Sequence, residues 1–151
     1  MWQGNKGLEA QPNVVPGSDG AGVVVAIGQS VTTFKPGDKV VASLTIKMGE
    51  DEKPMFANTA AGLGQSEDGT LAEYCILDES DVISMPPKIS FEEACTLTCS
   101  ALTAWNALFG GKGLKKGDYV LTQGTGGVSV AALQVSAAVP RYHSTALKAV
   151  I

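Results

Sequence analysis

The stretch YVLTQGTGGVSVAALQ, residues 119–134, decides the fold of this chain. Its first five residues, Tyr119–Gln123, include aromatic and β-branched side chains, which favour a strand. The small residues Gly124–Gly127 predict a tight loop, because glycine adopts turn conformations at little steric cost. The apolar residues from Val128 to Ala138 predict a helix. A strand, a glycine-rich loop and a helix in succession indicate the start of an α/β unit.

A corner of this kind can bind a pyrophosphate. Glycines let the phosphates approach the backbone, and the helix N-terminus offers free amides and positive potential. Compared with the dinucleotide-binding pattern Gly-x-Gly-x-x-Gly, the loop reads Gly124-Thr125-Gly126-Gly127-Val128-Ser129, with serine in the third glycine position. Taken by itself, the pattern is equally compatible with a purely structural corner.

The chain before this stretch is β-rich. Four strands are expected over residues 23–27, 39–44, 70–77 and 81–85, with a long polar loop at 47–69. Ser90-Phe91-Glu92-Glu93 is a capping box, so a helix should begin there and continue at helical apolar spacing to Leu108. These patterns divide the chain into a β-rich unit, residues 1–93, and the start of an α/β unit, residues 94–151.

Composition excludes several classes of protein. The net charge of −4 argues against a nucleic-acid partner, which needs a basic surface. No apolar run reaches the roughly 18 residues that span a bilayer, so no membrane partner is expected. The N-terminus lacks the apolar core of a secretory signal. Three cysteines without repeated spacing do not suggest a disulfide framework. We therefore expect a soluble, cytoplasmic protein.

Further landmarks lie in order along residues 12–134. They are Pro16-Gly17-Ser18-Asp19-Gly20-Ala21-Gly22, followed by Phe34-Lys35-Pro36-Gly37-Asp38, then Asp68-Gly69-Thr70-Leu71-Ala72-Glu73-Tyr74, Leu97–Trp105 and Gln123–Ser129. Together they resemble the medium-chain dehydrogenase/reductase superfamily, closest to its alcohol dehydrogenase and quinone oxidoreductase branches. The resemblance implies a mixed fold: a GroES-like partial barrel, followed by the first strand–glycine loop–helix of a Rossmann α/β domain.

The same resemblance implies hydride transfer between NADP or NAD and a small-molecule substrate: an alcohol, a carbonyl, or a quinone or enone. It places Thr103 near the nicotinamide. It assigns the rest of the cofactor contacts to the loop residues Gly124, Thr125, Gly126, Gly127, Val128 and Ser129. No residue can be assigned as the proton donor, so the catalytic residues remain unknown. Asp19, in the glycine-rich stretch expected to face the cleft, is a candidate for contact with substrate or cofactor.

Zinc is not expected. Zinc members of the superfamily carry a histidine where this chain has Ser18, and catalytic zinc needs three protein ligands. The only histidine is His143, in the C-terminal tail, and residues 47–69 contain no cysteine for a structural zinc. Cys95 and Cys99 lie four residues apart on an expected helix, where core packing is the better explanation.

The resemblance also implies that the chain is truncated at both ends. A dinucleotide domain needs about six parallel strands, and only 33 residues run from Tyr119 to Ile151. The tail from residue 135 is atypical, and no acidic residue follows Asp118 to bind a ribose, although a second strand could form over 146–151. Two hypotheses follow. The first is an NAD(P)H-dependent, zinc-independent oxidoreductase impaired by truncation. The second is a non-catalytic fragment or interaction module derived from such an enzyme, which docks on a full-length partner, aggregates, or forms homo-oligomers through exposed strand edges.

Overall fold

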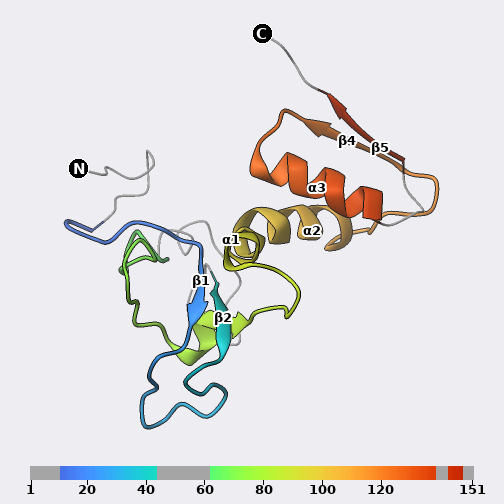
Figure 1. The fold of residues 1–151 in the computed structure, drawn as a ribbon. Coiled ribbons are helices and arrows are strands. Elements are labelled where there is room, and N and C mark those ends of the chain that lie inside the picture. Colours follow the sequence, from blue (N-terminus) through green and yellow to red (C-terminus); the bar gives the residue numbers. More distant parts are fainter. Residues whose placement is uncertain (1–10, 44–61, 139–142, 148–151) are drawn as a thin grey trace. The chain divides into compact units, whose positions relative to one another are not determined.

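The computed structural model describes residues 11–43, 62–138 and 143–147, and the chain divides into two compact units, Met1–Thr98 and Cys99–Ile151 (Figure 1). The first unit contains β1 (Gly20–Val23), β2 (Lys39–Ala42), η2 (Glu79–Asp81), β3 (Val82–Ser84) and α1 (Phe91–Cys95). The π-helical turn η3 (Leu97–Ala101) spans the division. The second unit continues with α2 (Leu102–Phe109), β4 (Tyr119–Gln123), α3 (Gly127–Ala138) and β5 (His143–Leu147).

The first unit is built on a three-stranded antiparallel sheet in the order β1-β2-β3. Gly20 pairs with Ala42 and Val23 with Lys39, while Val41 pairs with Ile83. Val41 and Ala42 are buried, and α1 packs on β1 and β2 with Ala94 inside. The expected strands at 39–44 and 81–85 are therefore confirmed in their described central parts.

The expected strand at residues 23–27 is wrong. The strand instead occupies the glycine-rich Gly20–Val23, although residues 24–27 have the stronger β propensity. The reason is the available partner: the Val24 N–H donates to the Asp38 carbonyl, and the Gly37 N–H donates to the Val24 carbonyl. The paired segment turns at residues 35–38, just before β2, so the pairing between β1 and β2 ends at Val23. Val25 and Ile27 are left exposed.

The expected strand at residues 70–77 is also wrong. The amides of Thr70 and Leu71 donate to the carbonyls of Gly17 and Pro16, and the Gly69 amide donates to the Val15 carbonyl. This pairing holds only the start of the segment, which continues as bends and irregular structure. Its alternating apolar pattern is present, but no other strand pairs with it in the described part of the chain. A strand needs a partner as well as a pattern.

Residues 68–71 approach residues 15–17 at backbone contact distance. A Cβ on Gly69 would lie 2.0 Å from the Gly17 carbonyl oxygen, so only glycine fits there. Gly17 itself has φ +102°, a conformation that other residues rarely adopt. The small residues of the stretch at 17–22 therefore serve close backbone packing.

The helix predicted from Ser90 is confirmed, including its capping box. The Glu93 N–H donates to Ser90 Oγ at 3.2 Å, and the Ser90 N–H donates to Glu93 Oε2 at 2.8 Å. The apolar pattern leaves room for an internal break before Gly110, and the chain forms α1, the π-helical turn η3 and α2 in succession. Among the described residues, no helix is long and apolar enough to cross a membrane.

The second unit is a strand–helix–strand arrangement. The parallel strands β4 and β5 pair from Tyr119 with His143 to Gln123 with Leu147, and α3 packs across them with α2 beside it (Figure 1). The predicted strand at 119–123 and helix at 128–138 are confirmed. The second strand lies at 143–147 and begins earlier than the expected 146; residues 148–151 lie outside the described part.

Candidate functional site

The corner between β4 and α3 is the candidate site. Gly124 takes φ +80°, which turns the chain sharply after the strand. The Val130 N–H donates to the Gly126 carbonyl at 3.0 Å, closing the first helical turn. A helix leaves its first amides without intrahelical partners, so the amides that follow Gly126 are available to an anion. A Cβ on Gly124 or Gly126 would meet no atom within 4 Å, so the corner is open.

Ser129 closes the corner from the helix side. Its Oγ–H donates to the Gln123 carbonyl at 2.9 Å, linking the first turn of α3 to the last residue of β4. In the dinucleotide-binding pattern the third glycine serves close packing of helix on strand. In this chain a serine stands in the third glycine position, and its hydrogen bond keeps the helix close to the strand.

Gly127 sits against the neighbouring helical segment. A Cβ built on it would lie 2.7 Å from Ser100 Oγ and 3.2 Å from Ser100 Cβ. Three alanines are buried at the contact between α2 and α3, namely Ala104 of α2 and Ala131 and Ala132 of α3, and Ala101 and Leu108 pack beside them. The close packing of α3 against η3 and α2 therefore holds the start of α3 in place.

The six loop residues predicted as cofactor contacts form this single corner. Gly124–Val128 are exposed and Ser129 is half-buried. Thr103 lies on α2, next to the buried Ala104, with its own side chain exposed. Ser100, in the π-helical turn η3, was not among the predicted residues, because its contact with Gly127 is between segments far apart in the sequence.

Asp19 is the centre of a hydroxyl network in the first unit. Its carboxylate accepts from Ser18 Oγ at 2.7 Å and from the buried Thr98 Oγ1 at 3.2 Å, while its carbonyl accepts from Thr70 Oγ1 at 2.7 Å. The structure thus engages the candidate carboxylate with the hydroxyls of Ser18 and Thr98, while the hydroxyl of Thr70 holds the backbone of Asp19. Thr70 and Thr98 lie 51 and 79 residues away along the chain, so no local signal could have identified them.

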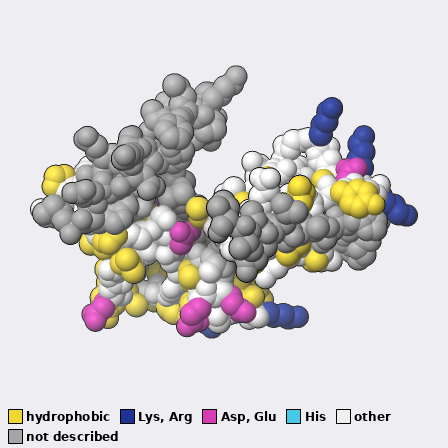
Figure 2. All heavy atoms as spheres, turned by 90° about the horizontal axis from the view of Figure 1, so that it is seen from above, with side chains coloured by type: hydrophobic (Ala, Val, Ile, Leu, Met, Phe, Trp, Pro, Cys, Tyr) yellow, Lys and Arg dark blue, Asp and Glu magenta, His cyan; other side chains and the backbone are white. Residues whose placement is uncertain are grey.

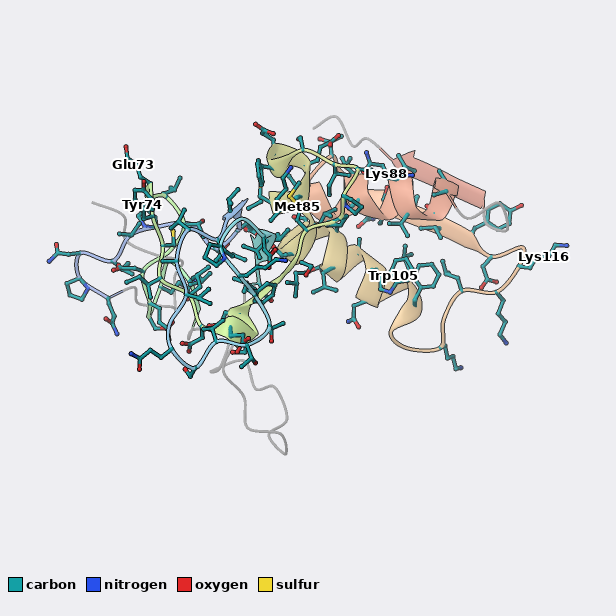
Figure 3. The ribbon with its side chains drawn as sticks, turned by 60° about the horizontal axis from the view of Figure 1, so that its bottom comes forward. Glu73, Tyr74, Met85, Lys88, Trp105 and Lys116 are labelled. Carbon is teal, nitrogen blue, oxygen red and sulfur yellow. The ribbon has the colours of Figure 1, made fainter. Side chains whose placement is uncertain are left out.

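An apolar groove of about 480 Å³ lies in the first unit, between the segment around β1 and residues 70–77. Val25 and Ile27 from the first of these segments, and Tyr74 and Ile76 from the second, are among the residues that line it. Ile76 is fully exposed and Tyr74 is 75% exposed. Figure 3 shows Glu73 and Tyr74 projecting from this segment, and Figure 2 shows apolar side chains open on the surface. The groove is an unfilled apolar surface.

No three residues among His, Cys, Asp and Glu gather into a metal-binding group within residues 11–43, 62–138 and 143–147. Cys95 Sγ donates to the Glu92 carbonyl at 3.2 Å, and Cys75 is exposed. The described part of the chain therefore contains no assembled metal site.

The family follows from comparison with known proteins. Residues 1–87 match the model of the alcohol dehydrogenase GroES-like domain. The chain belongs to the medium-chain dehydrogenase/reductase superfamily. Its first unit is accordingly a GroES-like domain with a small sheet.

Individual relatives agree with this family. The chain is 44% identical over 133 residues to a zinc-type alcohol dehydrogenase-like protein of Schizosaccharomyces pombe, covering 87% of this chain and 38% of that protein. It is 33% identical over 124 residues to human quinone oxidoreductase, covering 82% and 31%. A solved NAD-dependent alcohol dehydrogenase superposes with a TM-score of 0.74 and 34% identity, covering 91% and 41%. The chain thus spans about two fifths or less of the length of these relatives.

Proposed function

We propose that the chain is part of an NAD(P)H-dependent, zinc-independent oxidoreductase. Residues 94–151 would be the opening of a Rossmann nucleotide-binding domain, with residues 1–93 the GroES-like domain. The observation that carries the proposal is the open corner between β4 and α3, where a left-handed glycine leads into the first turn of a helix. The solved relative of similar fold is an NAD-dependent enzyme, which supports a nicotinamide cofactor.

The corner fits a dinucleotide in its chemistry. The amides after Gly126 would hold the pyrophosphate, and the exposed Thr125 hydroxyl could add a donor from the loop. Thr103 would lie toward the nicotinamide. When bound, the cofactor supplies a hydride to a carbonyl, quinone or enone, or accepts one from an alcohol; the protein's part is to orient and desolvate the reactants. The proposed cofactor is NADP or NAD.

Independence from zinc is part of the proposal. Ser18 stands where zinc members carry a histidine ligand, and the Asp19 carboxylate is already engaged by Ser18 and Thr98. The relative in Schizosaccharomyces pombe is named zinc-type, so the point needs its own measurement. Elemental analysis of the purified chain after dialysis should find less than one tenth of an equivalent of zinc, as an order-of-magnitude threshold for a site with too few ligands. One equivalent that survives dialysis would overturn zinc independence.

A fluorescence titration tests the cofactor site. NADPH and NADH fluorescence should change on adding the chain, with weak affinity because the chain spans only part of its relatives' length. Gly126→Glu should abolish the change, since it places a carboxylate in the open corner where phosphate would lie. Gly111→Glu is the matched control, because Gly111 is also exposed with open space. Equal loss in both variants, or no signal from the wild type at millimolar cofactor, contradicts the proposal.

The groove in the first unit favours a second candidate, a non-catalytic module that associates with another copy of itself. Exposed apolar side chains such as Ile76 and Val25 favour burial against a partner, and β1 and β3 are edge strands of the described sheet. Sedimentation velocity distinguishes this candidate. A chain that self-associates and binds neither NADPH nor NADH would support it over the oxidoreductase.

A further inference from the structure

Ser129 offers a single hydroxyl proton, and the structure shows where that proton goes. The Oγ–H donates to the Gln123 carbonyl at 2.9 Å. With its proton engaged, the oxygen presents only lone pairs on its remaining sides. Lone pairs repel the oxygens of a phosphate. The Ser129 side chain is therefore not a donor to an anion in this corner, whereas its backbone amide, in the first turn of α3, can be.

The hydrogen bond between Ser129 and Gln123 spans a glycine-rich loop with little intrinsic rigidity. Gly124, Gly126 and Gly127 all lie between Gln123 and Ser129, and glycine loses more conformational freedom on folding than any other residue. A second bond, from the Val130 N–H to the Gly126 carbonyl, closes only the helical end of the loop. The hydrogen bond from the Ser129 hydroxyl links the helical end of the loop to its strand end.

From this geometry, and resting on the proposed cofactor site, we infer that Ser129 is a positioning residue. Its hydroxyl holds the amides at the start of α3 in the orientation that receives the paired phosphates of a dinucleotide. Where the pattern has glycine at this position, close packing alone holds the helix against the strand. This chain uses a hydrogen bond for the same purpose, so the site depends on one side-chain hydroxyl.

The test compares Ser129→Ala with Ser129→Thr. Loss of one hydrogen bond between neutral groups should weaken NADPH affinity by roughly two- to tenfold in Ser129→Ala. Ser129→Thr keeps the hydroxyl and should retain most of the wild-type affinity. Rescue by threonine separates the hydroxyl's role from a simple need for a small residue. Ser136→Ala is the matched control, because its Oγ donates within α3 to the Leu133 carbonyl, away from the corner.

A second measurement does not depend on cofactor. Amide hydrogen exchange of residues 126–129 should be faster in Ser129→Ala than in the wild type, and near the wild-type rate in Ser129→Thr. Unchanged exchange in the alanine variant, or equal affinity in all variants, overturns the inference about Ser129. Absence of binding in the wild type, with exchange faster in the alanine variant, would instead overturn the cofactor site and leave the hydroxyl's structural role standing.

Discussion

Gly127 is the position in the candidate site where an added side chain would meet the tightest contact. In Gly127→Ala the new Cβ would lie 2.7 Å from Ser100 Oγ and 3.2 Å from Ser100 Cβ, so the serine hydroxyl must rotate away and the two segments must move slightly apart. Overpacking of this kind costs about 1–3 kcal/mol. We expect a lower urea midpoint for Gly127→Ala, and recovery in the double variant with Ser100→Gly, which removes the atoms in conflict.

The matched control is Gly126→Ala, one residue earlier, where a Cβ would meet no atom within 4 Å. It should leave the free energy of unfolding, measured by urea denaturation, within about 0.5 kcal/mol of the wild-type value. If Gly126→Ala and Gly127→Ala lower stability equally, the contact between Ser100 and Gly127 does not limit the packing.

Glu79 predicts a pH response at a single loop. Hydrogen bonds from the side chain and backbone of Thr33, with a further one from the Thr32 amide, lower the pKa of Glu79 below its ordinary value of 4.5. A carboxyl with a depressed pKa in the folded state stabilises the fold fully above its unfolded pKa. That contribution should be lost as pH falls below about 4.5 and through the lowered folded value.

NMR of the Thr32 and Thr33 amides against pH checks this response. Both shifts should titrate with a midpoint below 4.5. Glu79→Gln, which keeps an acceptor oxygen at every pH, should remove the titration. A midpoint at or above the ordinary value would show that these bonds are absent in solution.

At the scale of elements, the start of α1 depends on its reciprocal cap. Ser90→Ala removes the acceptor for the Glu93 amide and should cost about 0.5–2 kcal/mol of unfolding free energy. Glu93→Gln keeps an acceptor for the Ser90 amide and should cost less. Urea denaturation of both variants measures the difference. A larger loss in Glu93→Gln than in Ser90→Ala would show that the charge, rather than the cap, stabilises this helix.

Two turns show how far element boundaries follow from local sequence. At 35–38 and at 115–118 an aspartate carboxylate accepts from the lysine amide three residues earlier, and the glycine between them has positive φ. The side chain and the glycine determine the turn within four residues. Both turns were predictable, and each leads directly into a strand, β2 or β4.

Strand boundaries in the first unit were not predictable in the same way. The valine-rich residues 24–27 lie outside the sheet and the glycine-rich Gly20–Val23 lie inside it. Strand pairing depends on which distant segment offers free amides and carbonyls, and here the turn at residues 35–38 ends the pairing. Intrinsic β preference is weaker than that constraint.

At the scale of the whole molecule, apolar surface should control association. Ile76 is fully exposed, so Ile76→Glu removes no packing and should leave the thermal midpoint unchanged. It should lower any self-association, because it adds charge to the apolar groove. Gln134→Glu adds the same charge on an exposed position of α3 and should change association little.

Sedimentation velocity of the two variants and the wild type tests this effect. If the wild type is monomeric throughout the accessible concentration range, the groove does not bind a second copy. Equal suppression by both variants would indicate a general effect of net charge. The exposed aromatic side chain of Trp105, on α2 in the second unit, supplies a fluorescence probe for the same experiments (Figure 3).

By itself, the sequence determined the features that close within a few residues: the cap at Ser90, the two aspartate turns, and the order strand, glycine loop, helix at residues 119–138. It also carried the family landmarks. Only the tertiary structure decided which segments pair as strands, that hydroxyls of Thr70 and Thr98 converge on Asp19, and that Ser100 abuts Gly127. Local hydrogen bonds are set by spacing along the chain, whereas contacts between residues dozens of positions apart depend on how the packed backbone brings them together.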